Sequence, residues 1–122
     1  MEFSKADQEM HDKMLRSWIT PLQAEPYGYT NVLVDLPGTN ERPAQVGTSI
    51  PDLTAMTRNR ERVIGEVKTS NDIDNDHTRG QLSDYARTGA KIMLLVPKDS
   101  KPIADQVCQK WGFGQVQVWT YG

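Results

Sequence analysis

Three side chains in the segment between residues 50 and 69 could together carry out metal-assisted hydrolysis. Asp52 follows a proline, and Glu66 and Lys68 lie two residues apart in a run rich in β-branched residues. Because side chains alternate between the two faces of a strand, Glu66 and Lys68 should point the same way. If the intervening segment is a hairpin centred on Asn59, Asp52 faces Glu66, since each lies seven residues from that centre. The spacing therefore predicts two carboxylates and one amine at a common place on a sheet.

Two opposed carboxylates predict a site for a divalent cation. Directly opposed residues of antiparallel strands have Cβ atoms roughly 4.5–5.5 Å apart. Carboxylates at that distance repel each other unless a positive charge lies between them, and Mg²⁺ is satisfied by one or two carboxylates with water and phosphate oxygens. The alternative is a buried ion pair in which Lys68 only neutralises Glu66. The pairing with Asp52 favours the metal site, because an isolated acid-x-Lys triplet is common and another occurs at residues 99–101.

The same residues resemble the signature of the PD-(D/E)XK nuclease superfamily, with Pro51 and Asp52 as its first part and Glu66, Val67 and Lys68 as its second. The resemblance implies a restriction-endonuclease-like fold and a Mg²⁺-dependent nuclease, with Mn²⁺ as a substitute metal. It also implies that Asp52, Glu66 and the carbonyl group of Val67 hold the metal. Lys68 would then orient the attacking water and stabilise the charge that develops on the phosphate.

A second match lies on the next expected helix. Gln81 and Tyr85 fit the Gln-x-x-x-Tyr pattern of RecB-type members of this superfamily. Residues four apart share one face of a helix, from which they could address a phosphate or a base near the metal. The resemblance implies a catalytic role for Gln81 and substrate binding by Tyr85. The alternative is a Tyr85 that faces the core and a Gln81 that faces solvent.

Other polar residues are weaker candidates. Arg58 and Arg60 lie in the expected hairpin turn, where they could bind phosphate; a solvated turn that protects a sheet edge is the alternative. Many members of the superfamily carry an acid or a histidine on the first helix, and Glu9 is the first candidate and His11 the second. A surface role is expected for both, because Glu9 can pair with Lys13 one turn away.

An acidic loop precedes the second expected helix. Asp72, Asp74 and Asp76 alternate as in a calcium-binding loop, but His77 replaces the required glycine and Ser83 the bidentate glutamate. The loop is therefore expected to be solvated and to lie beside the active site, with His77 at the start of a helix.

The elements that must position these residues follow the order α-β-β-β-α-β-α-β. Helices are expected at 4–20, 77–88 and 103–111, and strands at 31–36, 49–56, 62–69, 92–96 and 116–121. The first helix is indicated by Phe3, Met10, Met14 and Trp18, and Pro21 is expected to end it. Right-handed crossovers after an antiparallel meander predict a three-layer α/β fold with a mixed central sheet flanked by helices.

The composition predicts one globular domain that spans residues 1–122. Hydrophobic residues make up 37% and charged residues 25%, which is typical of folded proteins. The net charge of −2 argues against strong nonspecific binding to DNA. Cys108 is the single cysteine, and no signal peptide or apolar membrane segment is seen, so a cytoplasmic protein without a membrane partner is expected.

Together these features predict an endo- or exonuclease that hydrolyses phosphodiester bonds of DNA, with RNA as the less favoured substrate. A homodimer would allow both strands of a duplex to be cut. The alternative is a catalytically silent nuclease-fold module that binds DNA or protein, or that dimerises. The complete acid–acid–lysine set favours the enzyme, because a relic has no reason to keep three costly buried charges.

Overall fold

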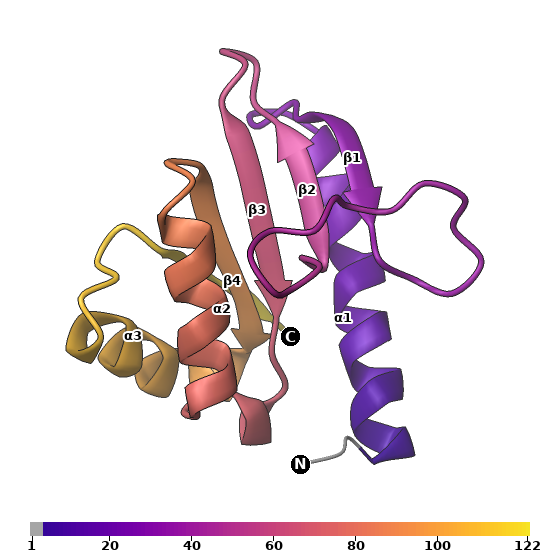
Figure 1. Ribbon diagram of the computed structural model, residues 1–122. Coiled ribbons are helices and arrows are strands. Elements are labelled where there is room, and N and C mark those ends of the chain that lie inside the picture. The colour runs from indigo at the N-terminus through magenta and orange to yellow at the C-terminus, as the bar shows by residue number, and fades with distance from the viewer. Residues whose placement is uncertain (1–3) are drawn as a thin grey trace.

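A five-stranded mixed sheet with helices on both faces makes up the computed structural model, which describes residues 4–122 (Figure 1). The helices are α1 (Lys5–Gln23), α2 (Asp76–Ala86) and α3 (Lys101–Lys110), with short 3₁₀ turns η1 (Ser70–Asp72) and η2 (Lys98–Ser100). The strands are β1 (Thr30–Val34), β2 (Leu53–Met56), β3 (Arg62–Val67), β4 (Lys91–Pro97) and β5 (Gln117–Tyr121). The expected order of elements and the α/β class are confirmed. Phe3 lies outside the described residues.

The sheet follows the chain order β1-β2-β3-β4-β5. Its first three strands form an antiparallel meander, and β3, β4 and β5 run parallel to one another. Parallel strands need crossover connections, and here α2 joins β3 to β4 and α3 joins β4 to β5. This arrangement places the carboxyl ends of three strands at one edge of the sheet.

The register of the β2–β3 hairpin is the expected one. Leu53 lies opposite Gly65 and Met56 opposite Arg62, so the residue before Leu53 is level with Glu66. The expected strand at 49–56 is too long, because β2 begins only at Leu53. Residue 51 is a proline, which cannot donate a ladder hydrogen bond, and the segment before it turns back on itself in the isolated bridge between residues 46 and 49.

Helix α1 extends beyond Pro21, so the expectation that this proline ends the helix is wrong. A proline inside a helix loses one hydrogen bond and strains the preceding turn, at a cost of about 3 kcal/mol. Continuing the helix places Leu22 in the core, where its side chain is fully buried, and this burial offsets part of the cost. The helix begins at Ser4, whose side chain accepts a 3.0 Å hydrogen bond from the backbone of Asp7, and its final turn is closed by a 3.0 Å bond from Ala24 N–H to the carbonyl of Thr20.

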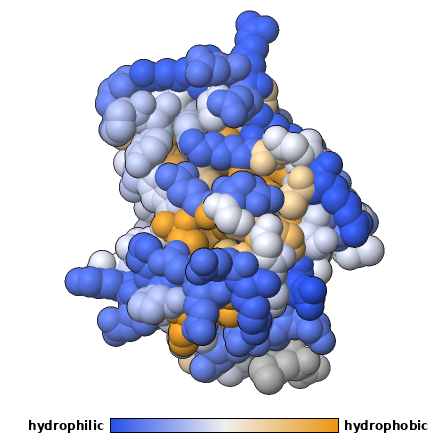
Figure 2. All heavy atoms as spheres, turned by 90° about the vertical axis from the view of Figure 1, so that its left-hand side faces the viewer, coloured by the Kyte–Doolittle hydropathy of each residue, from blue (hydrophilic) through white to orange (hydrophobic). Residues whose placement is uncertain are grey.

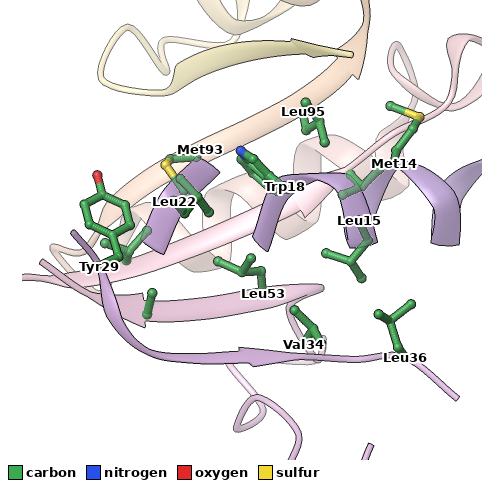
Figure 3. Packing of buried hydrophobic residues seen from close by; sticks show 13 residues of the cluster. Met14, Leu15, Trp18, Leu22, Tyr29, Val34, Leu36, Leu53, Met93 and Leu95 are labelled. Carbon is green, nitrogen blue, oxygen red and sulfur yellow. The ribbon is translucent and has the colours of Figure 1, made fainter. Parts of the chain in front are cut away.

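Helix α1 packs closely on one face of the sheet (Figure 3). Met14, Leu15, Trp18 and Leu22 recur at three- and four-residue steps and are buried there. Gly65 on β3 makes the close approach feasible, because a Cβ atom at that position would lie 2.9 Å from Cζ3 of Trp18. The helix face that carries Trp18 is therefore fixed against the strand that carries Glu66.

Helices α2 and α3 cover the other face with a second core. Leu82 and Tyr85 of α2 and Ala104 and Val107 of α3 pack there against strands β3 and β4. The face of the molecule on this side is mainly hydrophilic, with hydrophobic atoms exposed only in small areas, and the tip of the β2–β3 hairpin projects from its upper end (Figure 2). Among residues 4–122, no helix has the length and apolarity needed to cross a bilayer.

Candidate active site

A cavity of about 380 Å³ opens at the carboxyl end of β3. Its lining includes residues of α1 on one face of the sheet, of α2 on the other face and of η1. Figure 1 shows the two helices on either side of the end of β3. Asp52, Glu66, Val67, Lys68 and Gln81 all line it. The structure therefore brings together the predicted catalytic and metal-binding residues.

The carboxyl groups of Asp52 and Glu66 lie close enough for each to shift the pKa of the other, and both are almost completely buried. Burial and the adjacent negative charge of Asp52 raise the pKa of Glu66 well above its ordinary value. Burial also raises the pKa of Asp52, but hydrogen bonds with His11 and Glu66, and one of 2.8 Å from Val67 N–H to Oδ2, more than compensate, so its pKa is lowered. The environment of the pair thus favours the protonated form of Glu66 and the ionised form of Asp52.

His11 on α1 joins this pair, although a surface role was expected for it. Its Nε2 lies 3.1 Å from Oδ2 of Asp52, and its Nδ1 lies 3.2 Å from Oδ1 of Asp12. Burial lowers the pKa of His11, but the hydrogen bonds and charges of these two aspartates outweigh that effect and raise it. Glu9, the first candidate on this helix, is exposed, because a residue two positions from His11 lies on the far side of the helix.

A signal for His11 was present in the sequence. His11 precedes Met14 by three residues and Trp18 by seven, so it continues the apolar stripe of α1. A histidine within a stripe that packs on the sheet must lie near the strands, and Gly65 brings that stripe close to β3.

Lys68 is held between two carboxylates. Its Nζ lies 3.9 Å from Oε2 of Glu66 and 3.4 Å from Oδ2 of Asp72, and only 5% of its side chain is exposed. Asp72 is fixed in turn by a 2.8 Å hydrogen bond from Nδ2 of Asn75. The expectation of a fully solvated acidic loop is therefore wrong for Asp72, because the η1 turn folds it back onto Lys68; Asp74 is exposed as expected.

Tyr85 supports Glu66 and does not reach the cavity. Its hydroxyl group donates a 2.6 Å hydrogen bond to Oε1 of Glu66, and its side chain is fully buried. Burial and the charge of Glu66 raise the pKa of this hydroxyl, which stays protonated as a donor. The structure thus places Tyr85 behind the carboxylate and not in contact with the space that a substrate could fill. Gln81, one turn earlier on α2, does line the cavity.

The structure places neither Arg58 nor Arg60 at the cavity. Both lie at the tip of the β2–β3 hairpin, the end opposite Glu66. A strand rises about 3.3 Å per residue, so residue 60 is roughly 20 Å from the level of Glu66. Arg58 pairs instead with Glu25 at the end of α1.

The donor set suits a hard divalent cation. Among residues 4–122, no three His, Cys, Asp or Glu side chains form a ready-made metal-binding group. Asp52 bonds instead to His11 and to Val67 N–H, and Glu66 accepts a bond from Tyr85. However, the raised pKa of Glu66 means that the site disfavours a second negative charge, and a cation between the carboxylates would remove this penalty. Carboxylate oxygens are the ligands that Mg²⁺ and Mn²⁺ prefer, so the residues present fit the metal that the resemblance implies.

No family model, curated protein or solved structure matches this chain. The likeness to the PD-(D/E)XK superfamily therefore consists of the residues at the end of β3 and of the order of helices and strands. The chemistry of the cavity follows from its geometry alone.

Proposed function

We propose that this chain is a metal-dependent nuclease with a restriction-endonuclease-like fold, which hydrolyses phosphodiester bonds of DNA with Mg²⁺ or Mn²⁺. One observation carries the proposal: two neighbouring buried acids, Asp52 and Glu66, meet a buried Lys68 in a cavity that opens to solvent. Three charged groups of these types in one accessible place are what metal-assisted phosphodiester hydrolysis requires.

In this proposal Asp52, Glu66 and the carbonyl of Val67 would hold the metal, with the neutral form of His11 as a further ligand through Nε2. The bound metal would supply a nucleophilic hydroxide at neutral pH and neutralise charge on the phosphate. Lys68, fixed by Glu66 and Asp72, would present its ammonium group to the same phosphate.

A purely structural ion pair accounts less well for the charges. Four acids, Asp12, Asp52, Glu66 and Asp72, contact the two basic residues Lys68 and His11. Burial and the adjacent charge of Asp52 accordingly raise the pKa of Glu66. A buried network that served stability alone would be balanced, because uncompensated buried charge is destabilising. A bound cation would neutralise the negative charge that Lys68 and His11 leave uncompensated.

The alternative, a catalytically silent module that binds DNA or protein or forms a homodimer, is favoured by one observation. Asp52 already has His11 and Val67 N–H as partners, so the acids are satisfied in part without a metal. Cleavage assays distinguish the two functions.

The assay uses labelled linear duplex, plasmid, branched and single-stranded DNA, and RNA, each with Mg²⁺, Mn²⁺ or EDTA. We expect metal-dependent cleavage by the wild type and its loss in Lys68→Ala. Lys101→Ala is the matched control, because Lys101 is exposed and pairs only with Asp105 on α3. Equal cleavage by wild type and Lys68→Ala would contradict the assignment, and folded wild type that binds DNA without cutting it would favour the silent module.

A further inference from the structure

Two residues of the cavity carry buried polar atoms that no protein atom satisfies. Thr69 is 4% exposed and Gln81 is 9% exposed, and both line the cavity. Within the part of the chain that the structure describes, Oγ1 of Thr69, which can donate or accept, and Oε1 of Gln81, which can only accept, have no hydrogen-bond partner. Buried polar groups in native proteins are almost always hydrogen-bonded, so an unsatisfied pair beside proposed metal ligands calls for a partner from outside the chain.

The hydroxyl group of Thr69 has no role in the local backbone structure. Thr69 precedes the η1 turn, where a threonine often caps the backbone, but its side chain makes no capping hydrogen bond. Thr78 on α2 provides the contrast, because it is equally buried and its hydroxyl donates a 2.7 Å bond to the carbonyl of Asp72.

The charges around the cavity are distributed unevenly. On the side of α1 and β1 the lining carries the carboxylates of Asp7 and Asp35. On the side of η1 and α2, the only carboxylate that the described residues place in the lining is that of Asp72, which is paired with Lys68, and the lining also carries Thr69, His77 and Gln81. His77 lies in the first turn of α2, where the helix dipole favours an anion. An oxyanion that enters the cavity is thus repelled from the first side and finds hydrogen-bond donors on the second.

We propose that the hydroxyl group of Thr69 forms an anion subsite, in which it donates to a nonbridging oxygen of the phosphodiester that is to be cleaved. A hydroxyl group can donate, whereas the unsatisfied Oε1 of Gln81 only accepts and therefore does not contact the anion. The inference rests on the proposed nuclease function and adds a substrate contact, Thr69, on the side of the cavity away from the acids of α1. Because no atom of the described residues bonds to this hydroxyl, it is available to the substrate.

The test compares Thr69→Val, which keeps the shape and removes the hydroxyl, with Thr69→Ser, which keeps the hydroxyl. The first measurement is kcat and KM on the substrate that the wild type cleaves best, with Mn²⁺. The second is binding of a fluorescent single-stranded oligonucleotide in EDTA, by anisotropy. The third is Tm, with Thr78→Val as the stability control and the exposed Thr120→Val as the activity control.

We expect Thr69→Val to lower kcat/KM by about 10- to 100-fold, the size of a lost hydrogen bond to a charged group. Thr69→Ser and Thr120→Val should stay within about threefold of the wild type, an effect of under 1 kcal/mol. The Tm of Thr69→Val should equal or exceed that of the wild type, whereas Thr78→Val should melt at a lower temperature.

If the kcat/KM of Thr69→Val equals that of the wild type, the proposed subsite is wrong, while the nuclease function still stands. A Tm of Thr69→Val as low as that of Thr78→Val would also overturn the subsite, because the hydroxyl would then be structural. If the wild type cleaves nothing, the nuclease function fails, and the binding measurement decides the subsite separately. Weaker oligonucleotide binding by Thr69→Val than by Thr69→Ser would then support it, and equal binding would reject it.

Discussion

The hydroxyl group of Tyr85 donates a 2.6 Å hydrogen bond to Oε1 of Glu66, which ties helix α2 to the carboxylate at the end of β3. A carboxylate on a strand can rotate about its side-chain bonds, and this bond fixes one of its oxygens. The other oxygen, Oε2, lies on the side of Lys68. Tyr85 therefore supports the candidate metal ligand Glu66. This role explains why the side chain of Tyr85 lies in the core, whereas Gln81, one turn earlier on α2, lines the cavity.

Tyr85→Phe should weaken metal binding without unfolding the protein. The ring remains in the core, but Glu66 loses the donor that orients it, and loss of such a supporting bond typically lowers metal affinity 10- to 100-fold. Isothermal titration with Mn²⁺ measures the change, and Tyr121→Phe on β5 is the control. Unchanged Mn²⁺ affinity in Tyr85→Phe would show that the bond does not orient a metal ligand.

Glu66→Gln should raise the stability of the metal-free protein at high pH. The folded state raises the pKa of Glu66, so it binds a proton that the unfolded chain releases between the ordinary and the raised pKa. Stability of the wild type therefore falls as pH rises through that window, and a neutral glutamine avoids this loss. Urea unfolding in EDTA across a pH series should show the variant's advantage growing with pH and vanishing below the ordinary pKa of glutamate. A variant that is less stable at every pH would contradict the assignment of the proton to Glu66.

His11→Ala should reduce Mn²⁺ affinity about tenfold or more, the effect typical of a lost ligand or supporting partner. His11 contacts Asp52 directly, whereas Glu9 is exposed two residues away on the same helix. Glu9→Ala is therefore the matched control and should bind Mn²⁺ as the wild type does. If Glu9→Ala loses Mn²⁺ affinity and His11→Ala does not, then Glu9 and not His11 is the residue that α1 contributes to the metal site.

Gly65→Ala should destabilise the fold by about 1–3 kcal/mol, as expected for overpacking a core. The added methyl group would lie 2.9 Å from Trp18 and would push α1, with His11, away from β3. Gly80→Ala on α2 is the control, because its Cβ would meet nothing within 4 Å and alanine favours a helix by up to about 1 kcal/mol. Urea unfolding measures both, and equal stabilities would show that α1 adapts without cost.

The parts of the site that could be predicted are those fixed by local rules. The turn of the hairpin sets its register, so the placement of Asp52 level with Glu66 followed from counting residues on either side of Asn59. The same count puts residues 58–60 at the far tip, so the expectation that Arg58 and Arg60 bind substrate beside the metal conflicted with the register that predicted the acids.

The parts that could not be predicted depend on contacts between elements. Whether Tyr85 faces a substrate or supports Glu66 is decided by how α2 lies on the sheet, and the spacing of Gln81 and Tyr85 is the same in both cases. Asp72 joins Lys68 only because the chain forms a 3₁₀ turn directly after β3. Pro21 lies inside α1 although local rules disfavour it, and the burial of Leu22 one residue later offsets part of the cost.

The most direct test of the central claim is a calorimetric titration with Mn²⁺ at neutral pH, in two buffers of different ionisation enthalpy. If Asp52 and Glu66 share a cation, the wild type should bind Mn²⁺ and release protons as it does so, because the free protein raises the pKa of Glu66 and a bound cation would lower it. Asp52→Asn should lose the site. Absence of binding at millimolar Mn²⁺, or identical binding by the wild type and Asp52→Asn, would contradict the account.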